Sequence, residues 1–177
     1  LPNGSVDLVY LDPPFQSGRT YHLYTGVRTP APGPMAFDDT WTFGPHTQWA
    51  LDALVREHDR LGRALVGLYG FLGPCDMMAY LVTMAERIVE IHRVLRLTGS
   101  VFLHCDPTAS HYLKIVMDAV FGPECFRNEI IWRYRRWPTK AHRFQRMHDV
   151  ILYYTRTPNG CHTFHTLYGY EELSEST

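Results

Sequence analysis

Apolar and polar positions along this chain of 177 residues form short apolar runs separated by longer segments of helical periodicity. The first run, Val6–Leu11, is apolar apart from one aspartate and leads into two prolines, which predicts a buried strand that stops at residue 12. Similar runs at 100–105, 129–134 and 150–155 predict further strands.

Helical periodicity is clearest over residues 76–98, where apolar positions follow alternating steps of four and three. These positions are Met77, Leu81, Met84, Ile88, Ile91 and Leu95. We expect Asp76 to cap the start of this helix and Gly99 to stop it. The helix would present one apolar stripe to the core.

Other helical segments lie on either side of this helix in the sequence. Residues 47–72 predict two helical pieces with a break near Leu61-Gly62. Asp106-Pro107 is a favourable helix start, with the aspartate as cap and the proline in the first turn, and this helix would run to about residue 121. Residues 16–45 are rich in Gly, Pro, Thr and aromatic residues and predict a long loop, of the kind that is usually functional or disordered.

The order strand, loop, helices, strand, helix, strand, loop, strand is typical of an α/β domain with a mostly parallel sheet. Residues 1–157 would form this single domain, followed by a polar tail of low order at 158–177. In such sheets ligands bind beyond the C-terminal ends of the strands. The tetrad at residues 12–15 lies at such an end, which makes it the first candidate site.

The tetrad Asp12-Pro13-Pro14-Phe15 suits chemistry on an exocyclic amine of a nucleobase. The lone pair of that nitrogen is delocalised into the ring, and two acceptors that hold its N–H bonds would free it. The Asp12 carboxylate and the Pro13 carbonyl could be those acceptors, because the prolines fix the backbone and prevent helical closure. Phe15 offers a flat face to an extruded base, and the carboxylate would stabilise positive charge on the nitrogen. In isolation, the tetrad would favour a strand end with a proline turn, and the surrounding sequence changes that interpretation.

The net charge of −1 is spread unevenly along the chain. Residues 127–156 hold eight Arg or Lys side chains and two acids, whereas the remainder holds nine basic and sixteen acidic residues. The candidate nucleic-acid contacts are Arg133, Arg135, Arg136, Lys140, Arg143 and Arg146. Aromatic residues are interleaved among them, which favours contact with phosphates and unstacked bases over a solvated charged surface.

Several classes of protein and site are disfavoured. No apolar stretch is long enough to span a membrane, and the N-terminus has no signal-peptide pattern, so we expect a cytoplasmic protein. The four cysteines stand alone, which favours reduced thiols over a disulfide framework or zinc site. His104 and Cys105 are adjacent in a predicted strand and would point to opposite faces, so we expect no metal there. The chain lacks a start methionine and opens almost directly into a strand, so we expect it to begin within a longer one.

Four segments, in order, resemble the motifs of site-specific DNA amino-methyltransferases, which act on adenine N6 or cytosine N4. They are residues 4–15, 93–106, 126–132 and 148–155, and the resemblance covers about 1–157. It implies that Asp12, Pro13, Pro14 and Phe15 hold the target amine and base. It further implies S-adenosylmethionine as the methyl donor, double-stranded DNA as the partner and direct methyl transfer to a flipped base. An aspartate at the first motif position is similar to many adenine-N6 enzymes.

One part of the family pattern is absent from this sequence. In the similar enzymes a glycine-rich loop of F-x-G-x-G type binds the cofactor and lies C-terminal to the catalytic motif, and the 177 residues do not contain it. Gly67, Gly70 and Gly73 lie in a helical stretch and do not replace it. We therefore expect a partial Rossmann-like fold with sheet strands four to seven and without strands one to three. The cofactor-binding residues stay unassigned, with Asp12 adjacent to them, and the missing half or a restriction subunit becomes a candidate partner.

Two alternatives stay open at this point, and a third is discounted. The chain could be a truncated, inactive remnant that binds nucleic acid, which the missing glycine loop favours. It could methylate a glutamine side chain of a protein, although the related motif in that family typically has Asn at the position of Asp12. Pro74-Cys75 resembles the nucleophile of cytosine-C5 methylation, but no strand precedes it and the tetrad already occupies the catalytic position.

Overall fold

The computed structural model describes all residues except 16–17, 24–32, 138–139, 141 and 167–177. The expected low order of the tail at 167–177 lies outside the described residues. The elements, in chain order, are β1 (Val6–Leu11), β2 (Arg19–His22), β3 (Met35–Asp39), α1 (Pro45–Glu57), α2 (Asp59–Leu72), α3 (Asp76–Val94), β4 (Leu95–Cys105), α4 (Ser110–Phe121), the short 3-10 helix η1 (Pro123–Cys125), β5 (Phe126–Arg133) and β6 (His148–Thr155).

The main sheet is mixed, with the strand order β1-β4-β6-β5. β1 pairs with β4 in parallel, whereas β4 with β6 and β6 with β5 are antiparallel pairs. The prediction of an α/β fold is confirmed, but the prediction of a mostly parallel sheet is wrong. The described residues between β5 and β6 form no helix that could carry the chain back across the sheet, so β6 returns as the second strand of a hairpin.

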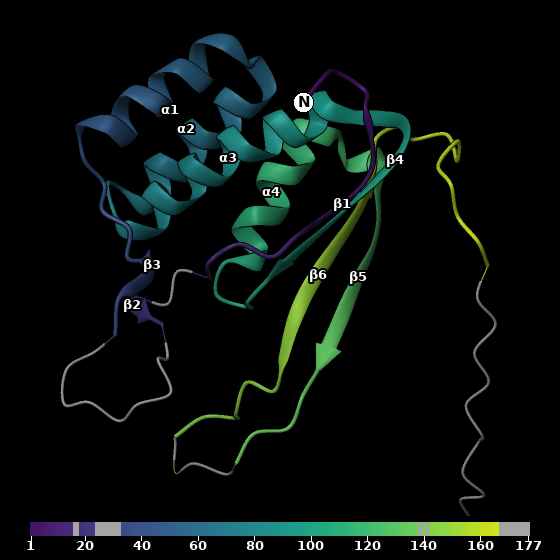
Figure 1. The fold of residues 1–177 in the computed structure, drawn as a ribbon. Helices are drawn as coiled ribbons and strands as arrows, with labels where there is room; N and C mark the ends of the chain where they lie inside the picture. Colours follow the sequence, from purple (N-terminus) through teal and green to yellow (C-terminus); the bar gives the residue numbers. More distant parts are fainter. Residues whose placement is uncertain (16–17, 24–32, 138–139, 141, 167–177) are drawn as a thin grey trace, which may run out of the picture.

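The helices gather on one side of this sheet, and α1 and α2 lie farthest from it (Figure 1). Leu103 of β4 and Leu152 of β6 are fully buried against side chains such as Leu81 and Leu113 of the helices. No described helix covers the other face of the sheet, where Leu8 and Tyr10 of β1 are 58% and 54% exposed. The strand predicted at β1 is confirmed, but its predicted burial is wrong because β1 is an edge strand packed on one face only.

Several other helix and strand boundaries also differ from the predictions. The helix predicted over 76–98 ends at Val94, because residues 95–99 join β4, and Gly99 lies within that strand. Leu95 continues the apolar stripe but is paired with Val6 in the sheet. The break between α1 and α2 falls at His58, four residues before Gly62. The strands predicted at 129–134 and 150–155 both begin earlier than expected.

The two predicted aspartate caps have different outcomes. Cys75, and not Asp76, is the N-terminal flanking residue of α3, and Asp76 lies in the first helical turn. Asp106 does cap a turn, since its Oδ1 accepts hydrogen bonds from the backbone N–H groups of Thr108 and Ala109 at 3.1 Å. That turn leads into α4, which begins at Ser110.

The segment predicted as a loop over 16–45 contains a small antiparallel hairpin in its described part. β2 and β3 pair from Arg19 opposite Asp39 to His22 opposite Met35. The hairpin projects from the helical side of the molecule beside the end of β1 (Figure 1).

Within the described part of the chain, no helix is long and apolar enough to cross a membrane.

Gly62 allows the closest approach between the first two helices. A Cβ atom at this position would lie 2.8 Å from the Val55 Cα and 2.9 Å from the Val55 carbonyl oxygen, closer than real side-chain atoms come. Gly67, five residues later on the same helix, is exposed, and a Cβ atom added there would meet nothing within 4 Å. The two glycines therefore have different roles despite sharing one helix.

We expect Gly62→Ala to lower the free energy of unfolding by about 1–3 kcal/mol, because the added methyl group forces α1 and α2 apart. Gly67→Ala is the matched control and should stabilise by up to about 1 kcal/mol, since alanine favours the helix. Urea unfolding followed by circular dichroism measures both. Equal effects of the two substitutions would contradict the close approach at Gly62.

Candidate active site and nucleic-acid interface

The predicted catalytic tetrad lies directly after β1, at the C-terminal edge of the sheet. The parallel register places Leu11, the last residue of β1, beside Leu103 of β4. The tetrad therefore follows directly after this pair, whereas β4 continues for two more residues, to Cys105. Pro13 and Pro14 have no backbone N–H group and end the strand pairing. The Asp12 side chain is 58% exposed and has no arginine partner among the described ion pairs. Its carboxylate is therefore accessible at the sheet edge and is not buried in the core.

A cavity of about 480 Å³ opens at the tetrad and contains all four of its residues. Its lining consists of Asp12, Pro13, Pro14, Phe15, Tyr21, Phe37 and Asp39. The last three belong to the β2–β3 hairpin, in the segment predicted as a loop. The Tyr21 and Phe37 rings are stacked, with centroids 4.6 Å apart and planes inclined by 16°. The cavity thus combines one exposed carboxylate with three aromatic rings.

Asp39 is the last residue of β3, and it is buried. Its Oδ1 accepts a hydrogen bond of 3.0 Å from the Trp41 indole N–H, and its backbone carbonyl accepts one of 3.1 Å from the Gly18 amide. The Trp41 ring meets the fully buried Tyr80 ring edge-on. Asp39 therefore anchors the hairpin to the helical layer, which leaves Asp12 as the exposed carboxylate among the residues that line the cavity.

His104 of β4 lies beside the tetrad and contacts it on two sides. Its Nδ1 is 3.4 Å from the Asp12 Oδ1 and 3.3 Å from the Tyr10 hydroxyl oxygen. Its ring meets Phe15 edge-on with centroids 5.1 Å apart. The pKa of Tyr10 is raised by partial burial and, to a smaller extent, by the charge of Asp12. The tetrad is thus tied to the second strand of the sheet.

Asp149 of β6 approaches the same histidine from the other side. Its Oδ2 is 3.5 Å from the His104 Nε2, and its Oδ1 accepts a hydrogen bond of 3.2 Å from the Tyr134 hydroxyl. Burial first, and then the nearby Asp149 charge, raise the pKa of Tyr134. Arg136 donates to that same hydroxyl at 3.3 Å and lies 5.0 Å from the centre of the Tyr134 ring. A row of polar contacts therefore joins β1, β4 and β6 at this edge.

Cys105 faces the core, opposite to His104, as the strand alternation predicted. It is completely buried, and burial followed by the Asp106 charge raises the pKa of its thiol to about 12. Its thiol is therefore neutral at physiological pH and is not placed to bind a metal with His104. Across the described residues, no three His, Cys, Asp or Glu side chains gather closely enough to hold a metal ion.

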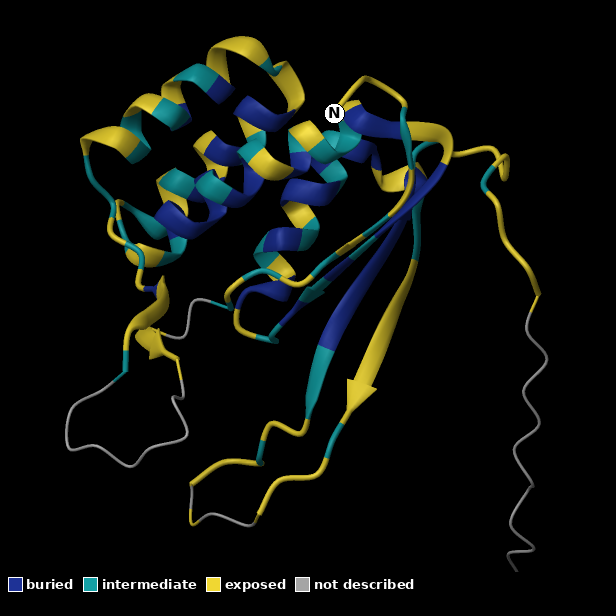
Figure 2. Cartoon of the chain, in the orientation of Figure 1, coloured by how far each residue is buried: buried dark blue, intermediate teal, exposed yellow. Residues whose placement is uncertain are grey.

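The predicted basic segment extends the β5–β6 hairpin beyond the sheet and is mostly exposed (Figure 2). Trp137 and Phe144 are 90% and 100% exposed, which leaves their flat faces open. Of the six predicted contacts, five are exposed and form no ion pair with an acid of the described residues: Arg133, Arg135, Arg136, Lys140 and Arg143. Arg146 is different, because it donates to the Thr108 hydroxyl and lies 3.8 Å from the Asp106 carboxylate.

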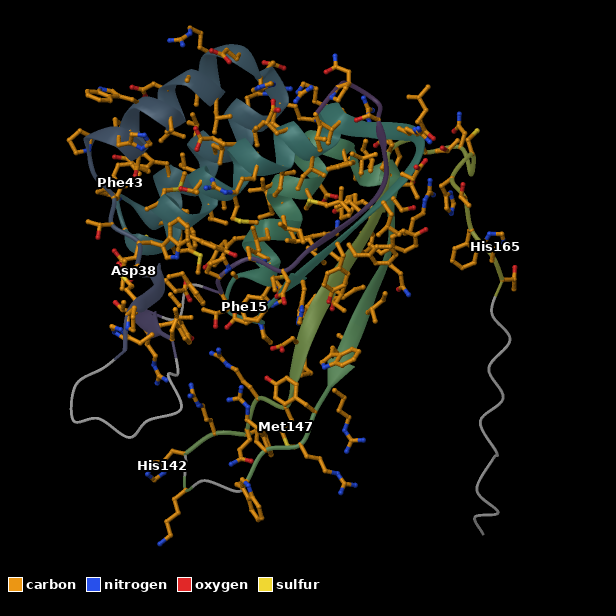
Figure 3. The ribbon with its side chains drawn as sticks, in the orientation of Figure 1. Phe15, Asp38, Phe43, His142, Met147 and His165 are labelled. Carbon is orange, nitrogen blue, oxygen red and sulfur yellow. The ribbon has the colours of Figure 1, made fainter. Side chains whose placement is uncertain are left out.

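The predicted catalytic tetrad and the basic hairpin lie at the same end of the sheet. Cys105 at the end of β4 pairs with Val150 near the start of β6, and Arg133 at the end of β5 pairs with His148. Figure 3 places Phe15 near the point from which the hairpin carrying His142 and Met147 projects. The two sets of predicted site residues therefore lie at the same edge of the sheet.

Comparison with known proteins agrees with the sequence resemblance. The family model N6_N4_Mtase, described as DNA methylase, matches residues 6–175 and so nearly the whole chain. The chain belongs to the DNA methylase family. The resemblance inferred from the four sequence segments is thereby confirmed.

Two curated relatives of this DNA methylase are the Mod subunits of type III restriction-modification enzymes. The StyLTI Mod subunit of Salmonella typhimurium is 24% identical over 157 residues, which cover 88% of this chain and 21% of the relative. The EcoP15I Mod subunit of Escherichia coli is 22% identical over 151 residues, covering 85% of this chain and 21% of the relative. The chain thus spans about a fifth of the length of the curated relatives it matches.

Several residues of the candidate site were not predicted from the sequence. Tyr21 and Phe37 reach the cavity through a hairpin of only four and five residues per strand, whose apolar alternation is too short to stand out. The sequence pattern tests His104 only as a metal ligand, and it gives Asp149 no role beyond one of the two acids of the basic stretch. The alternation along β4, which puts His104 on the face opposite to Leu103 and Cys105, was the available signal, but the partners of His104 depend on strand register.

Proposed function

We propose that this chain is the catalytic half of a DNA amino-methyltransferase that transfers a methyl group to the exocyclic amine of a flipped base. The observation that carries the proposal is the exposed Asp12 carboxylate in an aromatic-lined cavity at the sheet edge. The membership of the chain in the DNA methylase family supports it. Adenine N6 is the favoured target, because an aspartate at the first motif position is similar to many adenine-N6 enzymes.

The proposed role of Asp12 and Pro13 is to accept the two N–H bonds of the target amine. A carboxylate oxygen and a backbone carbonyl on adjacent residues can reach one NH2 group together, and this grip favours a pyramidal nitrogen with an available lone pair. The carboxylate would then stabilise the positive charge that develops on the nitrogen. Pro14 keeps the backbone extended, so that both acceptors stay at the cavity.

The aromatic walls of the cavity would receive the base after it leaves the stack. Phe15 is half-buried and held edge-on by His104, so it offers a fixed surface to one side of a flat ligand. The stacked pair of Tyr21 and Phe37 lines the same cavity from the β2–β3 hairpin. Stacking between aromatic surfaces and bases contributes about 1–3 kcal/mol per base, enough to offset part of the cost of flipping.

The methyl donor, S-adenosylmethionine, supplies the methyl group when it is bound. The described residues do not by themselves fit this cofactor: Gly67 and Gly70 lie inside α2, and neither follows a strand. β1 is the last strand of the order β1-β4-β6-β5, so its outer backbone edge has no partner among the described strands, and further strands of a longer protein could pair there. We therefore assign the cofactor site to a part of the protein outside these residues, next to the tetrad.

The basic hairpin is the proposed contact with double-stranded DNA. Its exposed guanidinium groups suit phosphates, and the open faces of Trp137 and Phe144 suit unstacked bases. Since the hairpin projects from the same sheet edge as the tetrad, DNA held there would bring its bases toward the cavity. The relatives named as Mod subunits make a restriction subunit a reasonable further partner.

Asp12→Ala in the full-length protein should lower methyl transfer to DNA by at least about 100-fold, because the amine loses its charged acceptor. Transfer of a radiolabelled methyl group from S-adenosylmethionine measures the rate. Asp59→Ala is the matched control, since Asp59 is an exposed aspartate on α2 whose ion pair within the described residues is with Arg63, far from the tetrad.

Undiminished transfer by Asp12→Ala, with circular dichroism unchanged, would contradict the assigned role of Asp12. A full-length protein that binds DNA but transfers no methyl group even without substitution would favour the alternative of an inactive DNA-binding remnant. Loss of transfer in both aspartate variants would show that the assay reports stability and not the site.

Replacing Arg135 and Arg136 together by alanine should weaken DNA binding and reduce its salt dependence. Each phosphate contact contributes about 0.9 to the log–log salt slope, so the slope should become shallower by about 2 if both side chains bind phosphate. Fluorescence anisotropy over a range of salt concentrations measures the slope. The paired control is Arg56→Ala with Arg63→Ala, which removes the same charge from the helical layer; an unchanged slope in the hairpin variant would refute the interface.

A further inference from the structure

His104 lies between two carboxylates that come from different strands. Its Nδ1 is 3.4 Å from Asp12 and its Nε2 is 3.5 Å from Asp149. The side chain is 15% exposed, whereas that of Asp12 is largely exposed. An exposed carboxylate on a loop after a strand has several rotamers available to it, and the histidine is the described group placed to select one of them.

The histidine is itself held in a fixed orientation. The Phe15 ring packs edge-on against it, and the Tyr10 hydroxyl is hydrogen-bonded at 3.3 Å to the same nitrogen that faces Asp12. Its Nε2 is buried, makes no hydrogen bond of good geometry with the described residues, and lies 3.5 Å from the Asp149 carboxylate. Asp149 is in turn fixed by the Tyr134 hydroxyl.

We propose that His104 is a positioning residue that orients the Asp12 carboxylate toward the target amine, a role that rests on the proposed function. Its Nδ1, 3.4 Å from one Asp12 oxygen, would hold that oxygen on its own side and leave the other free to accept an N–H bond of the base. Asp149 faces the Nε2 side of the ring and helps to fix its orientation, as carboxylates commonly do for histidines at functional sites. His104 itself does not contact the base.

The geometry favours this role over simple packing. A histidine that served only as a spacer under Phe15 would need neither nitrogen to face a carboxylate, whereas here both do. Neither carboxylate has a basic partner other than His104 among the described ion pairs. A spacer could be replaced by any side chain of similar size, but a donor aimed at Asp12 could not.

The two ring nitrogens can be tested separately by amide side chains. An asparagine amide nitrogen takes a position close to that of Nδ1, whereas a glutamine amide nitrogen takes one close to that of Nε2. His104→Asn therefore keeps the donor toward Asp12, and His104→Gln keeps the one toward Asp149. Glutamine also preserves most of the side-chain volume against Phe15.

In the full-length protein, His104→Gln and His104→Ala should each lower kcat by about 10- to 100-fold, the range expected when a reacting group is misplaced by about 1 Å. His104→Asn should retain kcat within about threefold of the unsubstituted protein, because its donor still reaches Asp12. KM for DNA should stay nearly constant throughout, because the basic hairpin is untouched. His111→Ala, on the exposed surface of α4, is the control.

Two results would overturn the role. Glutamine and alanine variants with unchanged kcat would show that Asp12 needs no orienting group. An asparagine variant that loses as much as the alanine variant, with thermal unfolding unchanged, would show that the Nδ1 donor is not what matters. If Asp12→Ala abolishes transfer while the His104 variants remain fully active, only the positioning role fails; if Asp12→Ala remains active, the proposed function fails first.

Discussion

The parallel pairing of β1 along β4 is the constraint on which the rest of this structure depends. It sets Leu11 beside Leu103, and Leu103 is completely buried against the helices, so the two strands cannot slide without exposing core side chains. The residues that follow this pair are Asp12 on one strand and His104 on the other. Their proximity is therefore a consequence of strand register, with the apolar core holding two polar groups at its edge.

The antiparallel return of β6 adds the second part of the site. It brings Asp149 to the same edge as Asp12 and carries the basic hairpin outward from it. β6 is the most deeply buried strand of the sheet (Figure 2), so the hairpin extends from a rigid base. Arg146 adds a further tie through Asp106 and Thr108 at the start of α4. The surface proposed to contact DNA and the cavity proposed to receive a base thus share one scaffold.

Much of this arrangement could be predicted from local sequence patterns. The strand before Asp12, the helical stripe from Met77 to Ile91 and the basic segment all carry strong local signals, and each is present in the structure. Leu95 was misassigned because a helical stripe and a buried strand can share an apolar residue. The strand pairing to Val6 decides between them, and that contact is remote in sequence.

The parts of the site that could not be predicted are those that depend on long-range register. Tyr21 and Phe37 belong to a hairpin whose strands are too short to show periodicity, and only its position beside the tetrad gives them a role. His104 sits in a strand with an ordinary alternating pattern. Nothing in that pattern indicates that Asp12 and Asp149, 92 residues before and 45 after it, lie on either side of its ring.

The central proposal is that an exposed carboxylate at the end of β1 grips an exocyclic amine of a DNA base. The most direct measurement is mass spectrometry of nucleosides from DNA incubated with the full-length protein and S-adenosylmethionine. Methyl groups on an exocyclic nitrogen, with N6-methyladenine as the expected product, would agree with the geometry of the tetrad. Methyl groups only on carbon 5 of cytosine, or on no nucleoside of DNA that the protein demonstrably binds, would contradict it.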